Sequence, residues 1–295
     1  SSISIRNYLE NIVLIIDPML NPDGRDRFAN WANGNRGHVA TIDLNDREHN
    51  QPWPGGRTNH YLYDLNRDWL PATQPESQGR LKLYYNWRPQ VVVDFHEMGR
   101  DRTYFFQPGI PSRNNPNTPE NVFNLTNKLA TYHAEALNNI GVLYYSKESF
   151  DDFYYGKGSS FPDITGAVGI LFEQASSRGL ATSTTSGELS YTFSIKNHFN
   201  ASLGTLKGMW EMRDEFLEHQ RNFYRDASKA AIQFPTKAYL ISTEYKKTQV
   251  GLLLNNLSQH QVKLHSLKKP YAANNMKFQP GKAVLVPVSQ PQSRF

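Results

Sequence analysis

The sequence predicts an α/β fold with a mixed, mostly parallel central sheet flanked by helices. Two apolar runs, Val91–Val93 and Val168–Phe172, have the length and the β-branched content of buried strands. A third run, Asn11–Asp17, has the same character, and a helical segment from about Thr73 to Trp87 lies between it and the strand at Val91. A strand, a helix and a second strand in this order are typical of a parallel crossover, so we expect a sheet covered by helices.

Composition narrows the class of protein. The chain has 295 residues, 38% of them hydrophobic and 20% charged, which is typical of a folded globular protein. The net charge of +5 is spread thinly, with no block of Lys and Arg, so nucleic acid is not an expected partner. There is no cysteine, and any metal must therefore be bound by His, Asp or Glu. The longest aliphatic run, Ile12–Ile16, is too short to span a membrane.

The N-terminal part should contain a strand, a turn and a long loop. The strand at Asn11–Asp17 is followed by Asn21-Pro-Asp-Gly24, in which Pro and Gly favour a turn. The segment from Arg25 to Thr58 is polar and shows little periodicity, so we expect an ordered loop there.

The remaining elements follow from apolar periodicity. We expect a helix over 121–140, a short strand over 142–145, a Tyr- and Gly-rich loop over 151–163 and one or two long helices over 196–231. From Phe234 a new pattern begins, with a strand at 238–242, a helix at 248–257 and an apolar run at 262–267. We therefore expect one domain over 1–232 and the short start of a second α/β domain over 233–295.

Chemically versatile side chains lie at the ends of the two central strands. His96 follows the first strand and Glu173 ends the second, and open α/β sheets bind ligands at the carboxyl ends of their strands. Asn66 and Arg67 precede the helix that leads into the first strand. A catalytic zinc takes three protein ligands and a water, a nearby carboxylate can accept a proton from that water, and a guanidinium matches a substrate carboxylate.

Five motifs occur in an order that resembles a known family. They are Asn21-Pro-Asp-Gly24, Asp64-Leu-Asn-Arg67, Asp94-Phe-His96, Tyr155 with Asp163, and Phe172-Glu173. Together they resemble the zinc carboxypeptidase family of carboxypeptidase A type over about residues 5–230. The resemblance implies a hydrolase that removes the C-terminal residue of a peptide with one zinc ion, and it implies a secreted or periplasmic location.

The resemblance also implies roles for individual residues. His96 matches the third zinc ligand, and Glu173 matches the general base that activates the zinc-bound water. Arg36 lies at the family's spacing after Gly24 for the arginine that stabilises the oxyanion, with Arg27 and Arg57 as rivals.

The substrate side of the site is implied in the same way. Asn66 and Arg67 match the pair that binds the terminal carboxylate of the peptide. Tyr155, with Tyr154 as its rival, matches the mobile tyrosine that closes over the substrate. Asp64 resembles the carboxylate that orients the first zinc histidine, a common support for metal ligands.

One departure from the family is serious. The first two zinc ligands of the family come from a His-x-x-Glu motif before the Asn-Pro-Asp-Gly turn, and no His of this sequence has Glu three positions later. We expect a fragment of a longer protein that by itself binds zinc poorly and is inactive. The alternatives are a metal-free peptide-binding module, or an amidase or deacylase acting on cell-wall peptides or acyl-amino acids. A loop metal site at His38, His49 and His60 is a further alternative.

Overall fold

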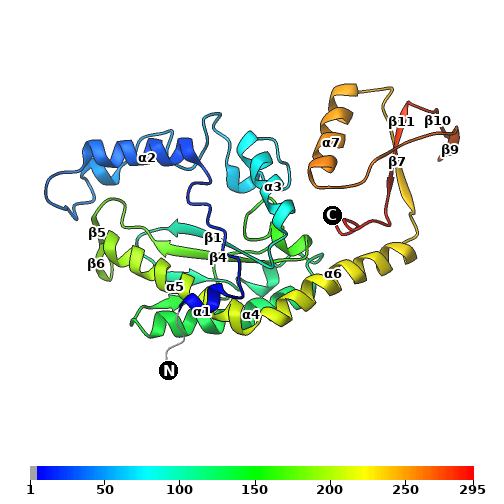
Figure 1. Cartoon of the computed structure of the whole chain (residues 1–295). Coiled ribbons are helices and arrows are strands. Elements are labelled where there is room, and N and C mark those ends of the chain that lie inside the picture. Colours follow the sequence, from blue (N-terminus) through cyan, green and yellow to red (C-terminus); the bar gives the residue numbers. More distant parts are fainter. Residues whose placement is uncertain (1–4) are drawn as a thin grey trace.

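The structure is a computed structural model that describes residues 5–295, and it is built around one mixed sheet (Figure 1). Four strands lie in the order β1 (Val91–Met98), β4 (Val168–Ala175), β2 (Tyr104–Phe106) and β3 (Tyr144–Tyr145). β1 is parallel to β4 and β2 is parallel to β3, whereas β2 runs antiparallel to β4. The predicted α/β fold with a mixed, mostly parallel sheet is confirmed.

Helices cover both faces of this sheet, as the layers in Figure 1 show. On one face lie α4 (Glu120–Asn138), α5 (Tyr191–Glu211) and α6 (Arg213–Gln233). Their apolar side chains form the larger core with β2 and β4, and its fully buried members include Tyr104, Leu129, Ile170, Phe172 and Phe216. α4 and α5 approach closely at Gly208, where a Cβ would lie 2.5 Å from a side-chain carbon of Leu129.

The opposite face is covered by α3 (Pro75–Trp87). Its aromatic residues Tyr84 and Tyr85 pack with Trp69 and Phe161 into a second core that also contacts Val92 of β1. Trp69 and Phe161 are 5.5 Å apart between ring centroids. This smaller core holds the loops at Trp69 and Phe161 against the sheet, directly below the predicted site.

The remaining elements of this part connect these layers. They are α1 (Ile5–Leu9), α2 (Pro22–Asn35), η1 (Arg47–His49), η2 (Leu65–Arg67), η3 (Pro111–Arg113), η4 (Phe161–Ile164) and a hairpin of β5 (Ala181–Thr184) and β6 (Gly187–Ser190). No helix among residues 5–295 combines the length and the apolar character that a membrane span needs.

The C-terminal residues form a separate small sheet beyond the end of α6 (Figure 1). β11 (Ala283–Pro287) lies between β7 (Ala238–Ser242) and β8 (His265–Ser266) and is antiparallel to both. α7 (Lys247–Gln259) connects β7 to β8, and β9 (Tyr271–Ala273) pairs with β10 (Met276–Phe278). The predicted strand and helix at the start of this segment are therefore present, and the division of the chain at 232/233 stays a prediction.

Two predictions for the N-terminal part are wrong. Residues 11–17 form no strand, because they pair with no strand of the sheet, and Val13 and Ile16 are 70% and 73% exposed. The segment after Gly24 is not all loop, since residues 22–35 form α2. The Asn21 side chain accepts a hydrogen bond from the Gly24 amide at 3.0 Å, and Pro22 occupies the first helical position, so this helix is capped as helices commonly are.

Candidate functional site

The parallel pairing of β1 and β4 brings the two predicted catalytic side chains together. His96 is in register with Glu173, so both side chains project from the same face of the sheet. Asp94 lies two residues before His96 and shares that face for the same reason. A one-residue change in register would separate these groups, and the buried side chains of β4 oppose such a shift.

His96 is held by two neighbours. Its Nε2 lies 2.9 Å from Asp94 Oδ1 and 2.9 Å from Asn66 Nδ2, and its side chain is 19% exposed. Burial is the largest single effect and lowers the pKa of His96, but the hydrogen bond to Asp94 and the negative charges of Asp94 and Glu173 together outweigh it, so the net effect is a raised pKa. The imidazole is thus fixed in one orientation at the end of β1.

Glu173 is set up to exchange a proton near neutral pH. Partial burial at the end of β4 raises its pKa to about 7, and the negative charge of Asp94 adds to this effect against the opposing charge of His96. A carboxyl group with this pKa can accept or donate a proton at physiological pH, which is the property that a general base or acid needs.

Asn66 connects the loop at residues 64–67 to this centre. It lies in the single turn η2, which begins where the Asp64 side chain accepts a hydrogen bond from the Asn66 amide at 2.9 Å. The Asn66 side chain donates to Asp94 Oδ2 at 3.0 Å and accepts from the buried Gly158 amide at 2.8 Å. Glycine is needed at 158, since a Cβ there would lie 2.9 Å from Asp94 Oδ2.

Arg67 stands at the rim of the same site. It is exposed, and its Nη1 donates to the Asn66 carbonyl at 2.7 Å, which turns the guanidinium back over the loop. The structure thus brings together three of the predicted site residues, His96, Glu173 and Asn66, and Arg67 adjoins them as the residue after Asn66.

Of the three candidate arginines, Arg57 lies at this site. Its Nε donates to Asp64 Oδ2 at 3.1 Å, and its positive charge lowers the pKa of both His96 and Glu173. Arg27 instead donates to main-chain carbonyls of residues 55, 58 and 59 and so holds the loop. Arg36 is exposed at the end of α2, and no described contact joins it to the site. Its oxyanion role stays a prediction, with Arg57 as the better placed arginine.

The two tyrosines of the 151–163 loop lie differently. The Tyr154 hydroxyl donates to the Arg67 carbonyl at 3.1 Å, within the pair that is predicted to bind the substrate. The Tyr155 hydroxyl lies 2.8 Å from Thr118 Oγ1, and burial raises the pKa of Tyr155 to about 12. Tyr154 therefore contacts the site in this conformation, whereas the role predicted for Tyr155 would need a movement of the loop.

The same loop is fastened to β4 by a buried carboxyl group. Asp163 Oδ1 accepts from the Gly169 amide at 2.8 Å, and a Cβ on Gly169 would lie 1.9 Å from the carbonyl oxygen of Ser159. Burial and the neighbouring Asp152 raise the pKa of Asp163 well above its usual value. These contacts fix the position of the Gly158 amide relative to the strand that carries Glu173.

The sequence did not identify every group that lies at the site. Asp94 was named only as part of a motif. The signal for its role is the two-residue alternation of a strand, which places the side chains of Asp94 and His96 on the same face. Arg57 was one of three arginines considered for the oxyanion role, and nothing in the sequence distinguished it from the other two. The Gly158 amide carried no signal at all, because its importance depends on a contact with a residue 92 positions earlier.

The residues described do not by themselves fit a zinc ion. A catalytic zinc takes three protein ligands, and His96 is the imidazole present at this site. Within residues 5–295 no group of three His, Asp or Glu side chains is arranged to hold a metal, including the loop histidines considered above.

Comparison with known proteins identifies the family. The family described as zinc carboxypeptidase matches residues 1–174, more than half of the chain. No curated protein matches. Among solved structures, the crystal structure of a metallo-carboxypeptidase from Burkholderia cenocepacia is similar at 13% sequence identity with a TM-score of 0.41. That match covers 67% of this chain and 56% of the other, so the chain spans little more than half of that protein. By the family match, this chain belongs to the zinc carboxypeptidase family.

Proposed function

We propose that this chain forms the carboxylate-binding and proton-transfer part of a carboxypeptidase active site, whose substrate is a peptide with a free C-terminal carboxylate. The observation that carries the proposal is the register of His96 with Glu173 below the Asn66–Arg67 loop. An imidazole and an acid that titrates near neutral pH then lie side by side, and the guanidinium needed for a terminal carboxylate belongs to the residue next to Asn66, which contacts His96.

Substrate binding rests on Arg67 and Asn66. The exposed Arg67 guanidinium can form two parallel hydrogen bonds to a carboxylate, an arrangement that a C-terminal amide or ester cannot reproduce. The Asn66 amide group, now bonded to Asp94, and the Tyr154 hydroxyl, now bonded to the Arg67 carbonyl, lie beside it and can add hydrogen bonds. The bound peptide would present its last carbonyl group toward His96 and Glu173.

The chemical step would use Glu173 and Arg57. With a pKa of about 7, Glu173 can take a proton from an attacking water and return it to the leaving amine. Arg57 supplies a positive charge for the developing oxyanion. Zinc, the metal of the family, would polarise the carbonyl group when bound. A zinc site needs two protein ligands besides His96, and they would have to come from outside the residues described here.

A metal-free peptide-binding module is the second candidate. It is supported by the lack, within residues 5–295, of three His, Asp or Glu side chains arranged to hold a metal. Such a module would recognise the same terminal carboxylate through Arg67 without cleaving the peptide. A secreted or periplasmic location, implied by the family resemblance, is compatible with both candidates.

Binding and turnover should be measured on the same peptides. We expect calorimetric titration to show that a short peptide acid binds and its C-terminal amide does not. Arg67→Met should weaken the binding of the acid at least about tenfold, and Arg225→Met, an exposed arginine of α6, should leave it unchanged. Binding of the acid and the amide with equal affinity would refute the proposal.

Turnover separates the two candidates. Where a complete zinc site is present, mass spectrometry should detect release of the last residue, and Glu173→Gln should slow that release by about 100-fold or more while zinc content is unchanged. The exposed Glu188 provides the matched control, since Glu188→Gln should not alter the rate. Binding without release from a zinc-loaded protein would support the module.

A further inference from the structure

The loop that carries Asn66 and Arg67 is contacted by the C-terminal part of the chain. α7 lies beside α3 in Figure 1, and its last turn reaches the main chain of Leu70 and Pro71, four and five residues after Asn66. These contacts join elements that are more than 180 positions apart in the sequence.

Two side chains make the contacts. Asn256 Nδ2 donates to the Leu70 carbonyl at 3.0 Å and to the Pro71 carbonyl at 2.7 Å. His260 Nε2 lies 2.8 Å from the same Leu70 carbonyl, and its Nδ1 lies 3.1 Å from the Tyr85 hydroxyl. Since a carbonyl oxygen only accepts, Nε2 carries a proton. Burial lowers the pKa of His260 to about 4, so the ring is neutral near pH 7 and Nδ1 accepts from the Tyr85 hydroxyl.

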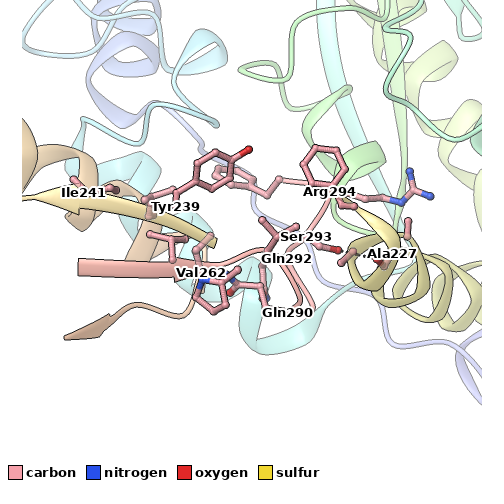
Figure 2. Close-up of a pocket in the computed structure, with 16 residues that line it drawn as sticks. Ala227, Tyr239, Ile241, Val262, Gln290, Gln292, Ser293 and Arg294 are labelled. Carbon is pink, nitrogen blue, oxygen red and sulfur yellow. Dashed lines mark hydrogen bonds between the residues drawn. The ribbon is translucent and has the colours of Figure 1, made fainter. Parts of the chain in front are cut away.

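His260 is also fixed by its surroundings. It is fully buried, and its ring lies 5.4 Å from that of Phe161 and 4.3 Å from that of Phe295 between centroids. A cavity of about 490 Å³ lies between α6 and the small sheet, and Ala227 of α6 and Tyr239 of β7 are among the residues that line it (Figure 2). The contact of Asn256 and His260 with the main chain of Leu70 and Pro71 is therefore specific and well packed, and the cavity lies beside it.

The same loop is also held by residues 154–158. The Trp69 amide donates to the Gly156 carbonyl at 3.1 Å, and the Gly158 amide donates to Asn66 Oδ1 at 2.8 Å. The segment 64–72 therefore has two supports, one from the 154–158 loop and one from α7. Pro71 lacks an amide hydrogen, so its carbonyl is the hydrogen-bonding group through which α7 can hold the main chain there.

We propose that Asn256 and His260 are positioning residues for substrate binding, and that the C-terminal residues 237–295 set the affinity for a terminal carboxylate by fixing the 64–72 loop. The proposal rests on the proposed function, since it assumes that Asn66 and Arg67 bind that carboxylate. Loss of the α7 contacts frees the Leu70 and Pro71 carbonyls and lets the guanidinium of Arg67 move relative to Glu173.

The test compares four variants of the whole chain. Asn256→Ala and His260→Ala remove the contacts, and His260→Gln retains a donor at the position of Nε2. Gln261→Ala is the matched control, because Gln261 Oε1 accepts from Arg88 Nη2 at 3.0 Å in the same interface without touching the loop. Hydrogen–deuterium exchange over 64–72 and calorimetric affinity for N-acetyl-phenylalanine are the two measurements, with its amide as the negative probe.

We expect Asn256→Ala and His260→Ala to speed exchange over 64–72 and to weaken the affinity, each by about tenfold, with other segments unchanged. His260→Gln and Gln261→Ala should stay within about twofold of the original chain. Asn256 is only half-buried, so Asn256→Ala keeps the test valid if His260→Ala fails to fold.

Three outcomes would overturn the proposal. One is a folded Asn256→Ala with unchanged exchange and affinity, and another is faster exchange that spreads evenly over all segments. The third is an equal effect of Gln261→Ala. If the original chain binds no acetyl-phenylalanine, the proposed function fails, while the exchange of 64–72 still decides whether α7 positions the loop.

Discussion

Replacing Asn66 by alanine should loosen the whole site, because this one side chain joins three separate segments. It donates to the Asp94 carboxylate at 3.0 Å and accepts from the Gly158 amide at 2.8 Å. Its third neighbour is His96 Nε2 at 2.9 Å, but that nitrogen also faces Asp94 Oδ1, so we count only two hydrogen bonds.

The magnitude follows from those two bonds. A hydrogen bond to a charged group contributes about 1.5–3 kcal/mol, and a buried amide left without a partner costs about 1–3 kcal/mol. Asn66→Ala should therefore lower the free energy of unfolding by about 3–5 kcal/mol. For a protein of this size that corresponds to a decrease of roughly 6–20 °C in Tm.

Differential scanning calorimetry measures the decrease in Tm. Hydrogen exchange of the Gly158 amide then shows whether the loss of its hydrogen bond to Asn66 causes that decrease. Asn127→Ala is the matched control, since Asn127 is exposed and bonds only to Phe123 in its own helix at 2.8 Å. We expect its Tm to change by less than about 2 °C. The reasoning would be refuted by an Asn66→Ala variant whose Tm also stays within about 2 °C, or by a lowered Tm without faster exchange at Gly158.

Three further perturbations test the surroundings of the site. Gly169→Ala should destabilise the fold by about 3 kcal/mol or more, because the added Cβ would lie 1.9 Å from a backbone oxygen. Gly99→Ala is the control, since its Cβ would meet nothing within 4 Å, and urea unfolding should show unchanged stability. Buried Asp163 has a raised pKa, so the folded state binds more protons than the unfolded state above about pH 4, and stability falls as pH rises. Tm measured from pH 5 to 8 should fall less for Asp163→Asn than for the original chain, and an equal fall would contradict this assignment. Tyr154→Phe should weaken the binding of a peptide acid and Tyr155→Phe should not, and calorimetric titration that gave the reverse order would favour Tyr155.

The fold was predictable where long segments have a clear apolar period. β1, β4, α4 and the two helices α5 and α6 were all predicted at nearly their observed positions, because their buried faces are continuous. α2 was missed because its residues are polar on most faces, so that its cap at Asn21 was the only local signal. The run at Ile12–Ile16 has the composition of a strand, but a strand also needs a neighbour to pair with.

Within the site, the residues on strands were easier to predict than those on loops. His96 and Glu173 lie at strand ends, where register and alternation determine which side chains meet. Arg57 and Tyr154 lie on loops, where no period indicates the direction of a side chain. Chain spacing favoured Arg36 and Tyr155, whose roles stay predictions, and spacing does not report how a loop folds back onto a sheet.

Nuclear magnetic resonance of side-chain nitrogen groups tests the central claim most directly. Titration with N-acetyl-phenylalanine should shift the signals of Arg67 Nε and Asn66 Nδ2, together with the Gly158 amide that bonds to Asn66, whereas the corresponding amide should leave them unchanged. The account predicts that these three signals shift with one common dissociation constant. Shifts confined to other parts of the molecule, or equal shifts with the acid and the amide, would contradict it.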